Sequence, residues 1–97
     1  MYPVLIKRCN QDYLVYVPDI DQFTEGKSFS DAIYMARDLL GTCSLSGPLP
    51  DPSTSQEAVA VAEQKADNDE FKWSDGVLTF VDIDEEEYRK QTEDKIL

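Results

Sequence analysis

Residues 13–41 read YLVYVPDIDQFTEGKSFSDAIYMARDLLG, and this stretch decides the fold. The run from Tyr13 to Val17 is rich in β-branched and aromatic residues, which favour a β-strand. Pro18 follows and removes a backbone donor, so the strand ends there. Gln22–Lys27 then predicts a short third strand with Gly26 at a bend.

The second half of this stretch predicts a capped amphipathic helix. The Ser28 hydroxyl is well placed to cap the helix, and Asp31, three residues later, gives a variant of the capping box. Apolar residues then recur at three- and four-residue steps: Phe29, Ile33, Ala36, Leu40 and Cys43. Such a stripe covers one face of a sheet.

The flanking sequence supplies the remaining expected elements. They are a strand at 2–8, a loop at 44–55, a helix rich in small residues at 56–66, a short strand at 71–73, a strand at 77–83, and a charged helix at 85–95 capped by Asp84. This pattern predicts an α+β domain with a three- to four-stranded antiparallel sheet covered on one face by a helix. The expected order is β-β-β-α-β-α in a single domain over residues 1–97, with 44–76 as a variable loop and helix insertion.

Composition argues against most enzymatic chemistry. The chain of 97 residues has no histidine, so it lacks the commonest general base and the commonest neutral metal ligand. Its two cysteines, Cys9 and Cys43, are too few for a disulfide framework or a zinc site of Cys and His ligands, and they are expected to be buried or half-buried thiols. We therefore expect no catalytic residue, no metal and no cofactor.

The formal net charge is −11, and the acidic residues are concentrated in the second half of the chain. Nucleic-acid binders need cations to displace counterions, so direct binding of DNA or RNA is not expected. A basic protein would be attracted instead. No apolar run is long enough to cross a bilayer, and the N-terminus lacks a signal-peptide layout, so we expect an intracellular protein that does not bind membranes.

Two groups of carboxylates stand out as candidate sites. Asp19 and Asp21 flank a turn and would suit a divalent cation only with further oxygen ligands; a solvated turn explains them as well. The run 82–87 lacks the glycine and the spacing of a calcium loop, and helix capping by Asp84 explains it. Tyr13, Tyr16 and Phe23 lie on adjacent expected strands, either within the core or as anchors for a partner.

The order of these motifs resembles the HicB-like antitoxin family. The resemblance covers nearly the whole chain and is carried by residues 2–6, the strand ending in Pro18-Asp19, the turn 23–26, the helix 31–38, the loop 49–53, and 81–84 followed by 87–90. It implies a fold like a reduced ribonuclease-H core, in a bacterial cytoplasmic protein. It also implies a partner, a small basic HicA-like mRNA interferase toxin, and self-association as a dimer or tetramer.

The resemblance departs from the family at its end. Such antitoxins usually carry a ribbon-helix-helix or helix-turn-helix segment after this domain, whereas this sequence stops at Leu97. Either the chain is truncated or it is a stand-alone version. We expect Asp19, Asp21 and Glu25 to be exposed contacts for the toxin. The alternatives are a self-associating domain, or a metal-dependent nuclease that uses Asp19, Asp21 and carboxylates around Asp82.

Overall fold

The computed structural model describes residues 1–65, 76–84, 86–87 and 90. The expected strand at 71–73 and most of the expected helix at 85–95 lie outside these residues. The described elements are the strands β1 (Tyr2–Cys9), β2 (Asp12–Val17), β3 (Gln22–Gly26) and β4 (Val77–Val81), the 3-10 turn η1 (Pro18–Ile20), and the helices α1 (Phe29–Ser44) and α2 (Ser55–Lys65). The predicted α+β class with a small antiparallel sheet is confirmed.

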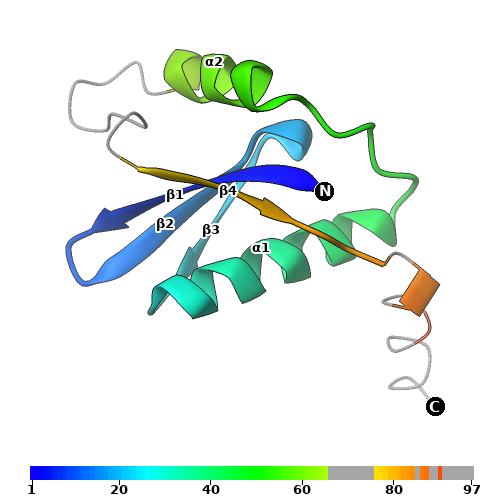
Figure 1. Cartoon of the computed structure of the whole chain (residues 1–97). Coiled ribbons are helices and arrows are strands. Elements are labelled where there is room, and N and C mark those ends of the chain that lie inside the picture. Colours follow the sequence, from blue (N-terminus) through cyan, green and yellow to red (C-terminus); the bar gives the residue numbers. More distant parts are fainter. Residues whose placement is uncertain (66–75, 85, 88–89, 91–97) are drawn as a thin grey trace.

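The strands lie side by side in the order β3-β2-β1-β4, and each neighbouring pair is antiparallel. β1 and β2 form a hairpin whose turn places Asn10 at φ 60°, in the left-handed region that asparagine tolerates. β4 comes from far along the chain and pairs with β1, Tyr2 opposite Val81. β3 and β4 are therefore the two edge strands of the sheet (Figure 1).

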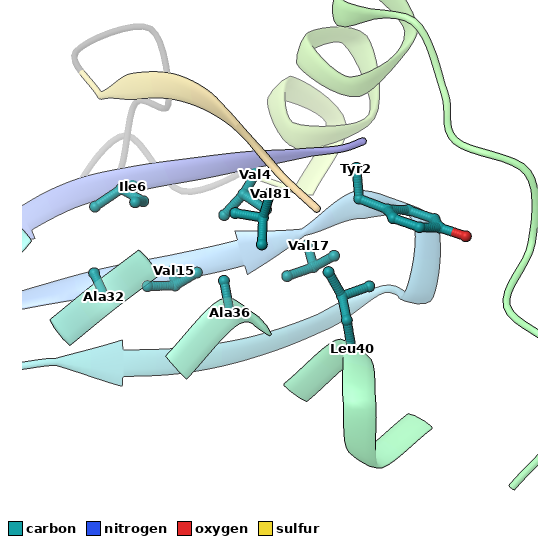
Figure 2. Packing of buried hydrophobic residues seen from close by; sticks show 9 residues of the cluster. All are labelled: Tyr2, Val4, Ile6, Val15, Val17, Ala32, Ala36, Leu40 and Val81. Atoms are coloured by element: carbon teal, nitrogen blue, oxygen red, sulfur yellow. The ribbon is translucent and has the colours of Figure 1, made fainter. Parts of the chain in front are cut away.

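Helix α1 covers one face of the sheet. The core between them consists of Tyr2, Val4, Ile6, Val15, Val17, Ala32, Ala36, Leu40 and Val81, all buried (Figure 2). The sheet residues in this set alternate along their strands, as expected when one face is buried. The predicted helix stripe is confirmed at Ala36 and Leu40, which point into this core.

Helix α2 covers the opposite face, so the expectation of a helix on one face only is wrong (Figure 1). A second core forms there from Leu5, Tyr16, Ala58 and Ala62. The two alanines present no bulk beyond a methyl group, which lets the helix lie close to the large sheet residues. The small side chains that suggest a marginal helix in the sequence are what fit it to this face.

The start of α1 is fixed by two devices. The Asp31 amide donates to Ser28 Oγ at 3.1 Å, and the Lys27 amide donates to Asp31 Oδ2 at 2.9 Å, which confirms the predicted cap. Gly26 lies so close to the helix that an added Cβ would be 2.4 Å from the backbone nitrogen of Ala32. Only glycine permits this approach of β3 to α1.

A reciprocal capping box begins α2. The Glu57 amide donates to Thr54 Oγ1 at 3.2 Å, and the Thr54 amide donates to Glu57 Oε1 at 3.1 Å. The Thr54 amide and hydroxyl lower the pKa of Glu57 below its usual value. Within the described residues, neither helix has the length and apolar character needed to cross a membrane.

Candidate protein-binding surface

Asp19 lies in η1 and is half-buried. Its carboxylate accepts hydrogen bonds from the Ser53 amide at 3.1 Å and from the Ser53 hydroxyl. These bonds join the turn after β2 to the loop that leads into α2. Asp19 therefore holds the second helix in place.

Asp21 ends η1 in the left-handed conformation, at φ 50°. Its Oδ1 accepts a hydrogen bond from the Tyr16 hydroxyl at 2.7 Å and lies 3.2 Å from Lys65 Nζ at the end of α2. The Tyr16 hydroxyl, followed by Lys65, lowers the pKa of Asp21. Burial, followed by the hydrogen bond to the Asp21 carboxylate and the charge of that carboxylate, raises the pKa of Tyr16. The Asp21 side chain is still 57% exposed, so part of its charge faces solvent.

Asp19, Asp21 and Asp82, which the sequence suggested as metal ligands, each contact a different partner. Asp19 accepts from Ser53, and Asp21 accepts from Tyr16 and Lys65. Asp82 lies 3.4 Å from the N-terminal ammonium group. In the part of the chain that the structure describes, no three His, Cys, Asp or Glu side chains are grouped to hold a metal ion.

Phe23 is the most unusual residue near these carboxylates. It lies on the edge strand β3, and its side chain is 48% exposed. Its ring stacks on the buried Tyr16, with the ring centroids 4.5 Å apart and an interplanar angle of 31°. The stacking on Tyr16 supports the Phe23 ring, so its exposed surface is positioned before a partner binds.

Asp21, Phe23 and Glu25 form a strip along the edge of the sheet, which we call the β3 strip. Phe23 and Glu25 share the α2 side of the sheet, because side chains alternate along a strand. Asp21, just before β3, lies on the same side through its contacts with Tyr16 and Lys65. Glu25 is exposed, as the sequence predicts. The strip thus presents an aromatic ring between two carboxylates, an arrangement that suits the guanidinium or ammonium group of a basic partner.

A shallow hollow of about 310 Å³ lies beside the end of the strip. It is lined by Asp12, Glu25, Gly26, Lys27, Asp31 and Met35. Three of these are acidic and one is basic, so the hollow extends the negative surface beyond Glu25. It offers room for a long basic side chain next to the strip.

Of the three residues expected as exposed contacts, Asp21 and Glu25 are exposed, whereas Asp19 is half-buried. Of the three aromatic residues considered as core or anchors, Tyr16 is buried, Tyr13 is half-buried against Phe29, and Phe23 is exposed. Phe23 is thus the one of these three whose side chain is exposed, as an anchor for a partner requires. Its position two residues from Asp21 and two from Glu25, within a predicted strand, was the available signal.

The structure also places the two cysteines and the residues that follow β4. Both cysteines are free thiols, and the expected burial is confirmed for the half-buried Cys43 but wrong for the exposed Cys9. The Glu87 amide donates to Asp84 Oδ1 at 3.0 Å, which confirms Asp84 as a helix cap. The Arg37 side chain donates to the Asp82 carbonyl at 3.1 Å and ties α1 to the chain after β4.

Comparisons of the chain with protein-family models, with curated proteins and with solved structures find no match. The resemblance to HicB-like antitoxins remains a prediction from the sequence motifs. Function therefore has to be inferred from the surface chemistry together with that resemblance.

Proposed function

We propose that this protein is an antitoxin-type binding module that captures a small basic protein through the β3 strip. The observation that supports the proposal most directly is the half-exposed Phe23 ring, fixed on Tyr16 and flanked by Asp21 and Glu25. The resemblance of the sequence motifs to HicB-like antitoxins names the partner class, a HicA-like mRNA interferase. In this proposal the protein acts in the bacterial cytoplasm, is not an enzyme and does not bind nucleic acid itself.

The chemistry of the strip matches such a partner. A protein that cleaves RNA needs Lys and Arg residues to hold the phosphate backbone. An Arg or Lys placed over the Phe23 ring gains about 0.5–1 kcal/mol at an exposed site, and about 2 kcal/mol once water is excluded. Glu25 and the solvent-facing part of Asp21 would pair with neighbouring cations. A toxin engaged in this way could not bind RNA with the same residues.

The net charge of −11 supports capture at a distance. A negative field raises the rate at which a basic partner meets this surface. Ring stacking lowers the ordering cost at the moment of binding, because Phe23 is held before the partner arrives. Charge thus mainly sets the rate of association, and the aromatic contact mainly sets the lifetime of the complex.

The proposal is tested with a basic HicA-like toxin encoded beside this gene, purified as an inactive variant. Isothermal titration should show Phe23→Ala binding about tenfold to a hundredfold more weakly, as for an interface hot spot. The matched control is Phe80→Ala, which removes an aromatic side chain of similar exposure, 46%, from the opposite edge. If Phe23→Ala binds as tightly as the unmodified protein, the β3 strip is not the binding surface.

The rival hypothesis of a metal-dependent nuclease needs a separate measurement. It requires saturable binding of Mg²⁺ or Mn²⁺ and RNA cleavage that is lost in an Asp19→Ala variant. Circular dichroism must accompany that variant, because Asp19 also holds Ser53. Cleavage by the unmodified protein that depends on the metal and on Asp19 would overturn the binding-module proposal.

A further inference from the structure

Within the described residues, the edge strand β4 carries none of the features that usually protect an edge strand. Its sequence is Val77-Leu78-Thr79-Phe80-Val81, with no charged residue and no proline. Natural edge strands usually carry charges, prolines or bulges that prevent pairing with another chain. Within the described residues, β4 pairs with β1 only, and no other backbone hydrogen bond reaches it.

Apolar side chains are exposed on both faces of β4. Val77 is 51% exposed and lies on the α1 side of the sheet, opposite Ile6. Phe80 is 46% exposed and lies on the α2 side, opposite Pro3. A partner that only covered one face would leave the other side chain in water, whereas a strand added to the edge reaches both.

A groove of about 360 Å³ lies on the α2 side of β4. It is lined by Ser55, Gln56, Val59, Ala60, Glu63 and Leu78. Leu78 belongs to β4 itself, and the other residues belong to α2. A side chain approaching across the β4 edge next to Leu78 would therefore meet the mouth of this groove.

We infer that β4 pairs antiparallel with β4 of a second copy of this chain, about a two-fold axis at Thr79. This register pairs all five residues of the strand: Val77 meets Val81, Leu78 meets Phe80, and Thr79 meets Thr79 of the second copy. Each pair lies on one side of the sheet, because side chains alternate identically in the two strands. The result is one continuous antiparallel sheet formed from the two four-stranded sheets.

The register gives the exposed aromatic residue a defined place. Phe80 of each copy lies beside Leu78 of the other, at the mouth of the groove that α2 forms with β4. The fit is reciprocal, since each copy supplies one ring and one groove. Such self-complementarity is what a two-fold interface requires.

Charge favours a second copy at this edge over a basic partner. Each chain carries a net charge of −11, so two copies can approach closely only where acidic side chains are not opposed. In the proposed register Asp82 lies opposite Gly76 of the other copy, and the strand between these positions is neutral. A basic toxin would gain no ion pair along β4 itself.

Sedimentation velocity of the full chain tests the pairing without any toxin. We expect a species of about twice the 11.0 kDa chain mass that dissociates on dilution. Phe80→Glu should raise the dissociation constant at least about tenfold, because it places a carboxylate against an apolar groove. Phe23→Glu, with 48% exposure on the other edge, should leave the dimer intact. A chain that stays monomeric at the highest soluble concentration, or a dimer lost with Phe23→Glu but kept with Phe80→Glu, overturns the inference.

A cysteine cross-link tests the register independently of Phe80. Opposed residues in an antiparallel pair have Cα atoms about 4.5–5.5 Å apart, which a disulfide spans. In a chain with Cys9→Ser and Cys43→Ala, Thr79→Cys should form a covalent dimer under mild oxidation. Thr24→Cys, at the centre of β3 and likewise half-buried, is the matched control and should remain monomeric on a denaturing gel. Equal cross-linking of both variants would contradict the register.

The dimer inference does not rest on the antitoxin proposal. Failure of toxin binding leaves the sedimentation result unchanged, and a monomeric chain leaves the Phe23 titration interpretable.

Discussion

The two edges of this sheet have opposite chemistry. The β3 edge carries the β3 strip, in which one aromatic ring lies between two carboxylates. The β4 edge carries five uncharged residues, with an apolar side chain exposed on each face. β3 is also close to α1 at Gly26, whereas β4 borders an open groove next to α2.

This difference shows how a small domain could keep two interfaces separate, the proposed toxin contact at β3 and the proposed self-pairing at β4. A charged edge discourages pairing with an identical chain and attracts cations, while a neutral apolar edge favours a strand from an identical neighbour. The two edges lie on opposite sides of the same sheet, with β2 and β1 between them (Figure 1). Occupation of one edge therefore leaves the other accessible.

Gly26→Ala should disturb the packing of β3 against α1 and should have the largest effect on stability. The new methyl group would lie 2.4 Å from the Ala32 nitrogen and 2.6 Å from its Cα, and the rigid helix backbone has to shift. We expect a loss of about 3 kcal/mol in the free energy of unfolding, measured by urea denaturation. Gly47→Ala is the control, because nothing lies within 4 Å of the added Cβ, and its effect should stay within about 0.5 kcal/mol. Equal effects would show that the approach of β3 to α1 is not tight.

Asp19→Asn should destabilise α2, which lines the groove beside β4, more than it destabilises the β3 strip. The change removes a charge that accepts two hydrogen bonds from Ser53, so we expect a loss of about 1–2 kcal/mol in unfolding free energy. Amide hydrogen exchange should rise in α2 before it rises in β3. The exposed Asp51, two residues before Ser53, supplies the control Asp51→Asn, which should change neither quantity. A faster exchange confined to β3 would count against this assignment.

Added salt should act on the two edges with opposite sign. Screening weakens attraction between the acidic chain and a basic toxin, so the association rate should fall by roughly tenfold or more from low to high ionic strength. The same screening reduces repulsion between two chains of charge −11, so the dimer should become tighter. Stopped-flow mixing and sedimentation at matched salt concentrations measure the two effects. A salt response of the same sign in both would remove the electrostatic distinction between the edges.

Tyr16 and Asp21, at the start of the β3 strip, should make the free energy of unfolding depend on pH, with the smallest effect of these predictions. The raised pKa of Tyr16 makes its stabilising contribution complete below pH 10.0 and progressively lost above it. The lowered pKa of Asp21 makes its contribution complete above about pH 4 and lost on further acidification. Tyr16→Phe should therefore flatten the alkaline loss of stability, by up to about 1 kcal/mol in urea unfolding for the hydrogen bond. Asp21→Asn should flatten the acid loss of stability. Unchanged pH profiles in both variants would contradict the coupling.

Local sequence patterns predicted the strands and α1 well, because the periodicity and the capping residues of these elements lie within a short stretch of sequence. Ser28 and Asp31 cap α1 within four residues of each other, so the sequence contains the whole device. The strand expected at 77–83 is likewise found as β4, in which Val77 and Phe80 lie on opposite faces. In such cases the interacting groups are neighbours along the chain.

The position of α2 and the roles of two carboxylates could not be predicted in this way. Asp19 and Ser53 are far apart in sequence, as are Asp21 and Lys65, and only the tertiary fold brings each pair together. Helix periodicity is weak in α2, since its buried residues Ala58 and Ala62 contribute little apolar area. The face that α2 covers depends on the size of Tyr16 and Leu5 beneath it, which no local pattern encodes.

The pairing of β4 with β1 also has a consequence during synthesis. β1 acquires this neighbour only after about 75 further residues have been made, which takes roughly 4–15 s at about 5–20 residues per second. By the end of that interval β1, β2, β3 and α1 are complete in the nascent chain, while the outer edge of β1 still has no strand beside it. Newly made copies emerging from neighbouring ribosomes on one message would have this edge available, and a slow translation step before β4 would prolong the exposure.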